Sequence, residues 1–222
     1  MAEVYLRRLS RWQAEQERNA VADVYVDAYR GAAGTAGATG AARVAGAAGV
    51  AGAAGVVQGD RQGFLHRLEQ HVRHTGFDMV VADSAGTVGC AYGFRVPPAG
   101  EWWTEDEDIR GELPADVGHL TASGRTFLLA ELMVLPAHRR RGIATRMVEQ
   151  LLIRLDAELV VATTSGSGGD DGDGGDGHDP GGTGDTDGAA ETFRAWGWSR
   201  SPVPATGPHA AAREIWLRRP LR

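Results

Sequence analysis

Apolar and polar residues alternate along this chain with two different periods, and the period indicates where helices and strands form. Apolar residues recur every three to four positions in the stretch that ends at Tyr29 and again over residues 60–74, which is typical of helices with one buried face. Further helices are expected over 142–155 and 189–196. Strands are expected over residues 4–9, 77–82, 87–96, 126–134, 158–163, 198–203 and 213–218. This order of elements predicts an α/β fold with one mixed sheet and helices on its faces.

Residues 126–134, with the sequence TFLLAELMV, are almost continuously apolar, as expected of a strand covered on both faces. Pro136 ends this strand, and a turn with three arginines leads into a helix that is expected to begin around Gly142. The apolar stripe of that helix consists of Ile143, Met147, Val148, Leu151, Leu152 and Leu155.

The start of this helix has the features of an anion site. The first amides of a helix have no acceptor within the helix, and Gly142 lets an anion approach the backbone closely. Arg139, Arg140 and Arg141 add positive charge. These residues fit a cradle for a phosphate or pyrophosphate, and they fit equally an ordinary helix start with solvated arginines.

Glycine is concentrated in two segments without a regular apolar pattern. Of the 32 glycines in 222 residues, eight lie in residues 31–56 and eleven in 165–188. The second segment also contains seven aspartates and no basic residue, so it accounts for the net charge of −6. We interpret 31–59 and 165–188 as flexible inserts within one domain that spans residues 1–222.

Several kinds of site are excluded by what the sequence lacks. All 23 basic residues are arginine, so there is no lysine nucleophile and no phosphate-binding P-loop lysine. Cys90 is the only cysteine; we expect it in the core rather than as a nucleophile, and we expect no metal site. No apolar run approaches the about 20 residues of a membrane span. We therefore expect a cytoplasmic protein that binds neither membranes nor nucleic acid.

Two motifs together resemble those of the GNAT superfamily of N-acyltransferases. The first, Arg139-x-x-Gly142-x-Ala144, follows ELMVLP and is similar to the acyl-CoA-binding motif of that family. The second, AETFRAWGW over residues 190–198, resembles the family's short helix that ends in an aromatic residue, a spacer and Gly-Phe or Gly-Trp. The resemblance implies a mostly antiparallel sheet of GNAT type and an acetyl-CoA-dependent N-acetyltransferase.

The resemblance also implies how acetyl-CoA is held. Its pantetheine arm is expected to pair with the backbone of Leu132, Met133 and Val134, and a backbone N–H near Met133 is expected to stabilise the oxyanion. The acetyl group would then pass directly to a primary amine within one ternary complex. The alternative is a non-catalytic CoA-binding or protein-interaction module that kept the fold. The pyrophosphate is expected to bind at Arg139, Arg140, Arg141, Gly142, Ile143, Ala144 and Thr145.

Glu131 is the catalytic base expected from the sequence. It is the only charged residue of TFLLAELMV, and its apolar neighbours should raise its pKa towards neutrality. A buried carboxylate paired with an arginine for structural reasons is the competing interpretation, and His119 and His138 are weaker candidates for the base. Phe193 stands where many members of the family have a tyrosine that protonates the leaving thiolate, so no general acid is assigned.

The acceptor is expected to be a small-molecule amine or a protein amino group. Trp102, Trp103 and five carboxylates within residues 101–108 lie in a polar loop that, by the resemblance, overhangs the acceptor site. Aromatic faces and carboxylates suit a cationic amine. A solvated acidic loop anchored in the core by its tryptophans fits the same residues, and the sequence leaves a homodimer open.

Overall fold

The computed structural model of the chain describes residues 3–30, 61–96, 123–165, 186–201 and 213–219. Most of the two glycine-rich inserts lies outside these ranges, as does the loop with Trp102 and Trp103. The expectations about these segments therefore stay predictions.

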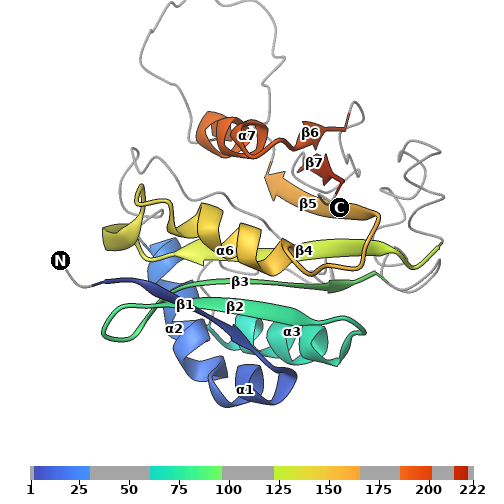
Figure 1. The fold of residues 1–222 in the computed structure, drawn as a ribbon. Coiled ribbons are helices and arrows are strands. Elements are labelled where there is room, and N and C mark those ends of the chain that lie inside the picture. Colours follow the sequence, from blue (N-terminus) through green and yellow to red (C-terminus); the bar gives the residue numbers. More distant parts are fainter. Residues whose placement is uncertain (1–2, 31–60, 97–122, 166–185, 202–212, 220–222) are drawn as a thin grey trace, which may run out of the picture.

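A seven-stranded sheet runs through the described part of the chain, in the order β1-β2-β3-β4-β5-β7-β6 (Figure 1). Among these strands only β4 and β5 pair in parallel, and every other neighbouring pair is antiparallel. The expected mixed, mostly antiparallel sheet is confirmed. The strands are β1 Tyr5–Leu9, β2 Asp78–Asp83, β3 Thr87–Arg95, β4 Thr126–Val134, β5 Leu159–Ser165, β6 Ser199–Arg200 and β7 Arg213–Arg218.

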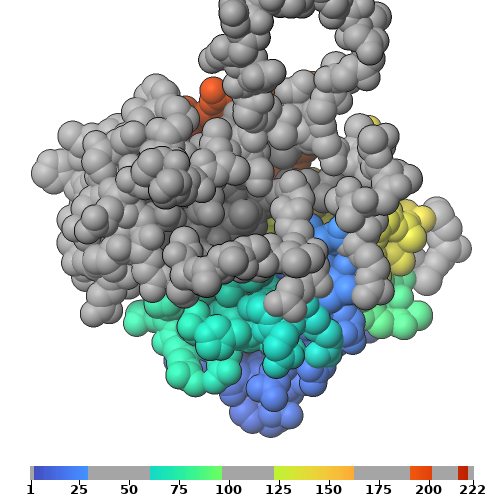
Figure 2. All heavy atoms as spheres, turned by 180° about the vertical axis from the view of Figure 1, so that it is seen from behind, coloured from blue at the N-terminus to red at the C-terminus, as the bar shows by residue number. Residues whose placement is uncertain are grey.

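Helices cover both faces of this sheet. α1 Arg11–Gln16, α2 Arg18–Arg30 and α3 Arg61–Arg73 pack on one face, and their apolar side chains form one core cluster with the strands. α6 Ile143–Leu152 and α7 Thr186–Ala195 form a second cluster on the other face. Figure 2, which views the molecule from behind, shows α1 to α3 gathered on one side of it in blue and teal. None of the described helices is long and apolar enough to cross a membrane.

The elements differ from the expectations in four places. The first helical stretch is divided at Glu17 into α1 and α2, α6 ends at Leu152 instead of Leu155, and β6 has only two residues. α7 begins at Thr186, so residues 186–188 of the expected insert 165–188 belong to this helix. α6 ends early because the chain must turn back to begin β5 beside β4. The amide of Glu158 already donates to the carbonyl of Arg125 at 2.8 Å, just before the two strands pair.

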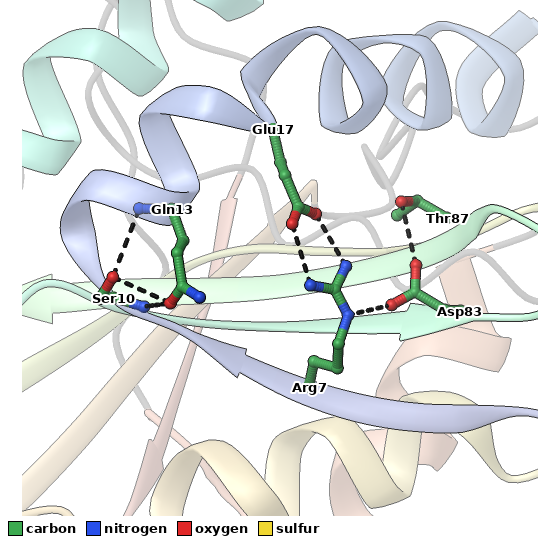
Figure 3. A network of polar contacts seen from close by, with 6 residues as sticks. All are labelled: Arg7, Ser10, Gln13, Glu17, Asp83 and Thr87. Atoms are coloured by element: carbon green, nitrogen blue, oxygen red, sulfur yellow. Dashed lines mark hydrogen bonds and ion pairs between the residues drawn. The ribbon is translucent and has the colours of Figure 1, made fainter.

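Arg7 on β1 ties the junction between α1 and α2 to the sheet (Figure 3). Its guanidinium donates to both carboxylate oxygens of Glu17 at 2.9 Å and to Asp83 on β2 at 2.6 Å. Thr87 donates to the same Asp83 carboxylate at 3.1 Å. These contacts fix the start of α2, whose far end reaches the candidate site.

Candidate active site

β4 and β5 pair only over their first residues and then separate. Residues 126–128 of β4 pair with 159–161 of β5, whereas the pairing with β3 continues to Val134. Figure 1 shows β5 turning away from β4 beyond this point. Within the part of the chain that the structure describes, residues 129–134 therefore have no strand on the side away from β3. The N–H and C=O groups that point to this side can pair with a ligand that lies like a strand.

The backbone groups on this open edge are those of Leu132 and Val134. The amide of Leu135 donates to the carbonyl of Val88 on β3 at 2.9 Å, and backbone groups alternate between the two sides of a strand. Met133, two residues earlier, therefore turns its own N–H and C=O towards β3. Of the three residues expected to hold the pantetheine arm, Met133 thus faces the other way, and the N–H groups next to it are the ones within reach of a ligand.

A bulge in β4 decides where Glu131 points. Tyr92 pairs with Glu131 while the next residue, Gly93, pairs with Leu129, so Ala130 is an extra residue in β4. Ala130 packs in the core cluster beneath α2 and α3, and Glu131 forms a hydrogen bond with α2, so both side chains lie on that face. Strict alternation would have placed Glu131 with Leu129 on the α6 face.

Glu131 is a buried carboxyl with a close hydrogen-bond donor. It is 5% exposed, and the Tyr29 hydroxyl donates to its Oε1 at 2.6 Å. Burial raises its pKa from 4.5 to about 7, although the Tyr29 hydrogen bond and the charge of Arg67 act in the opposite direction. This agrees with the raised pKa expected from its apolar neighbours. No arginine of the described residues forms an ion pair with it, as the competing structural interpretation required.

Tyr29 connects this carboxyl to further polar side chains of α2 and α3, whose role sequence reasoning missed. Nη2 of Arg67 on α3 donates to the hydroxyl of Tyr25 on α2 at 3.2 Å, and the rings of Tyr25 and Tyr29 lie 4.6 Å apart. The signal in the sequence is that two positions of the apolar stripe of α2 are tyrosines. A buried tyrosine still needs a partner for its hydroxyl, and that partner had to come from another element.

A second polar pair lies beside this group. Nδ1 of His71 on α3 is 3.2 Å from the hydroxyl of Tyr92 on β3. Burial lowers the pKa of His71 to about 3, so its ring is neutral near physiological pH. It adds no charge next to Glu131.

The start of α6 leaves backbone donors and space for an anion. Gly142 has φ 69°, a left-handed conformation that favours glycine, and a Cβ built there would meet no atom within 4 Å. The first bond of the helix runs from the amide of Arg146 to the carbonyl of Gly142, so the amides of residues 143–145 have no acceptor within the helix. Arg140 and Arg141 are exposed beside them. This arrangement fits a phosphate cradle.

Arg139 has a different place from that expected of a phosphate ligand. Its Nε donates to the carbonyl of Val134 at 3.1 Å, and its Nη2 donates to the carbonyl of Ala28 on α2 at 2.7 Å. Its amide donates to the carbonyl of Pro136 at 3.3 Å. The side chain thus fastens the end of α2 to the open edge of β4, and the candidate cradle is reduced to residues 140–145.

The second sequence motif packs against the start of α6. The indole Nε1 of Trp196, which directly follows α7, donates to the hydroxyl of Thr145 at 3.0 Å. Phe193 is fully buried, and its ring centroid lies 5.0 Å from that of Trp198 and 5.4 Å from that of Trp216. Position 193, where many members of the family have a tyrosine, therefore lies inside an aromatic cluster.

The remaining candidates divide into buried, peripheral and undescribed residues. Cys90 is fully buried, and burial raises the pKa of its thiol well above the usual value, which confirms it as a core residue. His138 lies in the short 3-10 helix η1, Pro136–His138, after β4. Three of the candidate site residues, Trp102, Trp103 and His119, lie outside the described ranges.

Comparisons with known proteins agree with this arrangement. A family model described as the acetyltransferase (GNAT) family matches residues 56–166, half of the chain, and these residues include β4, the arginine turn and α6. A search of curated proteins finds no match.

Solved structures share the fold. An acetyltransferase from Thermus thermophilus is 11% identical over 99% of both chains with a TM-score of 0.54. A GNAT family acetyltransferase from Bacillus cereus is 12% identical over 99% of both chains with a TM-score of 0.51. A GNAT family protein from Desulfovibrio desulfuricans is 14% identical over 99% of this chain and 100% of that chain, with a TM-score of 0.57. With the family match over half of its length and this fold, the chain belongs to the GNAT family of acetyltransferases.

Proposed function

We propose that this protein transfers an acetyl group from acetyl-CoA to a primary amine, with Glu131 as the base. The observation that carries the proposal is the place of Glu131. A buried carboxyl with a pKa of about 7 lies on β4 directly before the open edge at Leu132 and Val134. A base at that point can act on an amine that approaches a group held along the edge.

The same edge and the start of α6 suit the two ends of the acetyl-CoA arm. Amide groups of an extended pantetheine can pair with the backbone groups of Leu132 and with the N–H of Val134, whose carbonyl already accepts from Arg139. The pyrophosphate can accept from the amides of residues 143–145, where the missing side chain of Gly142 leaves room and Arg140 supplies charge. Acetyl-CoA supplies the acetyl group as a thioester, which is reactive towards an uncharged amine.

Glu131 performs the proton transfer in this proposal. The amine nitrogen bonds to the thioester carbonyl carbon, the carbon–sulfur bond breaks, and the proton lost by the amine passes to Glu131 directly or through water. With a pKa of about 7, a substantial part of the carboxyl is ionised at neutral pH, and it can release the proton to solvent after the reaction. The N–H of Leu132 or Val134 is the nearest donor for the thioester oxygen.

The leaving thiolate needs no phenol at position 193. Phe193 has no proton to donate and lies in an aromatic cluster. A CoA thiolate is a good leaving group and takes its proton from water. The acceptor is a small-molecule amine or a protein amino group.

Calorimetric titration with acetyl-CoA, followed by thiol release over a panel of amines, tests this proposal. Saturable binding together with amine-dependent thiol release supports it. Binding without thiol release for any amine would favour a CoA-binding module that kept the fold, and the phenylalanine at position 193 is the feature that favours this second candidate. Absence of binding contradicts both.

A further inference from the structure

Arg67 is a half-buried cation with few partners among the described residues. Within that part of the chain its guanidinium donates a single hydrogen bond, to the Tyr25 hydroxyl at 3.2 Å. Its central carbon lies 5.6 Å from the centroid of the Tyr25 ring and 6.0 Å from that of Phe64, so two aromatic rings cover it. A guanidinium carries several N–H donors in a planar fork, and most of them are left over here.

No carboxylate of the described residues forms an ion pair with Arg67. The other arginines of α3 differ, since Arg61 pairs with Asp23 and Arg73 pairs with Glu69. A half-buried guanidinium that keeps most of its donors unused near a candidate catalytic group points to an anionic ligand. The group that matches the guanidinium fork is a carboxylate or a phosphate.

Arg67 and Glu131 are close but do not touch. The charge of Arg67 acts on the Glu131 carboxyl, yet no ion pair within 4.0 Å joins the two. Neighbouring tyrosines of α2 connect the two groups, because Arg67 donates to Tyr25, Tyr29 donates to Glu131, and the two tyrosine rings lie 4.6 Å apart. A ligand on this face whose amine reaches Glu131 can extend a neighbouring substituent past the tyrosines towards Arg67.

We propose that Arg67 binds a carboxylate of the acceptor, so that the preferred acceptors are amines that carry a carboxylate on the adjacent carbon, as α-amino acids do. This inference rests on the proposed acetyl transfer and adds the class of acceptor. A carboxylate suits this half-buried site better than a phosphate because it is smaller and carries one charge instead of nearly two, so less charge has to be desolvated. The acceptor is then a zwitterion, with its amine at Glu131 and its carboxylate at Arg67.

Matched acceptor pairs test this inference. Each pair consists of an α-amino acid and the amine left when its carboxylate is removed, for example L-phenylalanine with phenethylamine and L-arginine with agmatine. We expect the wild-type protein to show a kcat/KM at least about tenfold higher for the amino acid in one or more pairs, mainly through KM. Equal or reversed preference in every pair overturns the inference.

The variant Arg67→Gln isolates the role of the guanidinium. It also removes a charge that lowers the pKa of Glu131, so rates are compared at a pH about two units above neutrality, where Glu131 is ionised in both proteins. The measured quantity is the kcat/KM for the amino acid divided by the kcat/KM for the matching amine. When this ratio is compared between the wild type and the variant, the intrinsic reactivities of the two acceptors cancel. We expect this ratio to fall about tenfold, and an unchanged ratio overturns the inference because Arg67 would then act only on Glu131.

Two further variants separate a loss of the Arg67 guanidinium from a general effect on folding. Arg73→Gln removes an exposed arginine from the same helix, and we expect the ratio to stay at the wild-type value. Arg67→Lys keeps the charge but loses the fork, so an intermediate ratio is expected even if Arg67→Gln does not fold. If amines without a carboxylate are acetylated and amino acids are not, the acceptor assignment fails while the proposed acetyl transfer stands. If no amine is acetylated, both fail.

Discussion

The hydroxyl of Tyr29 donates a 2.6 Å hydrogen bond to Oε1 of Glu131, although 102 residues separate the two in the sequence. One lies on α2 and the other on β4, so the contact joins the helix layer to the strand with the open edge. It favours the ionised form of a carboxyl that burial would otherwise keep protonated. Tyr29 therefore positions and tunes the candidate base.

Replacing Glu131 by glutamine is expected to lower kcat about 100-fold or more, because a positioned general base contributes on that scale. The Kd for acetyl-CoA is expected to stay within about twofold, since the proposed binding groups are backbone atoms of β4 and α6. Thiol release and calorimetry measure the two quantities. Glu149→Gln, on the exposed side of α6, is the control. Full turnover in Glu131→Gln would move the base to His119, His138 or a water chain.

Replacing Tyr29 by phenylalanine is expected to shift the pH dependence of kcat/KM. The lost hydrogen bond lowered the pKa of Glu131, so this pKa rises in the variant and the acidic limb moves to higher pH by about one unit. The loss of rate is therefore largest below neutrality and small well above it. Tyr25→Phe removes a hydroxyl that bonds to Arg67 instead, and a smaller shift is expected. An unchanged limb in Tyr29→Phe would show that its hydroxyl does not affect the base.

The free energy of unfolding is expected to depend on pH through the titration of Glu131. Its folded pKa of about 7 lies above the ordinary 4.5, so the folded state binds the proton more tightly than the unfolded state. Stability from this group is therefore fully present below 4.5 and is lost as the pH rises to about 7, by about 3 kcal/mol over the whole window. Glu131→Gln lacks this loss.

Denaturant unfolding of both proteins at pH values below and above this window checks that prediction. The variant is expected to gain stability relative to the wild type as the pH rises, whereas the other titrating groups, including His71, cancel in the difference. A difference that does not change with pH would mean that Glu131 titrates normally in the folded protein.

Gly142→Glu is expected to weaken acetyl-CoA binding at least about tenfold, because it places a carboxylate in the proposed pyrophosphate site. Gly124→Glu is a matched control. Gly124 has φ 68°, close to the 69° of Gly142, so the backbone strain is similar, at about 1 kcal/mol, but it lies before β4, at the end far from the cradle. Calorimetry of both variants separates charge from strain. Equal affinities in the two would contradict the cradle.

Phe193→Tyr is expected to leave kcat unimproved and to lower the free energy of unfolding by about 1–3 kcal/mol. The ring is fully buried between Trp198 and Trp216, so an added hydroxyl enters an apolar cluster without a partner arranged for it. Turnover and denaturant unfolding measure the two effects. A clear rise in kcat would show instead that position 193 reaches the leaving sulfur.

Local patterns along the sequence were sufficient for the elements that frame the site. β4 has the bounds expected from its apolar run, and α6 begins next to Gly142 with five of its six expected stripe residues buried. These predictions succeed because side-chain periodicity and a required left-handed glycine are properties of neighbouring residues. The same reasoning identified Glu131 as a charge within a buried strand.

Only the tertiary structure decided what that charge contacts. The bulge at Ala130 depends on the pairing with β3, where a Cβ on Gly93 would lie 2.2 Å from the carbonyl oxygen of Leu128. Because of this one extra residue Glu131 faces α2 and α3 instead of α6, so it meets Tyr29. Register and helix docking are settled by contacts between distant segments, and no pattern within β4 encodes them. The sequence by itself therefore determined that β4 carries a buried carboxyl before a phosphate-type turn, and packing determined which side chains surround that carboxyl.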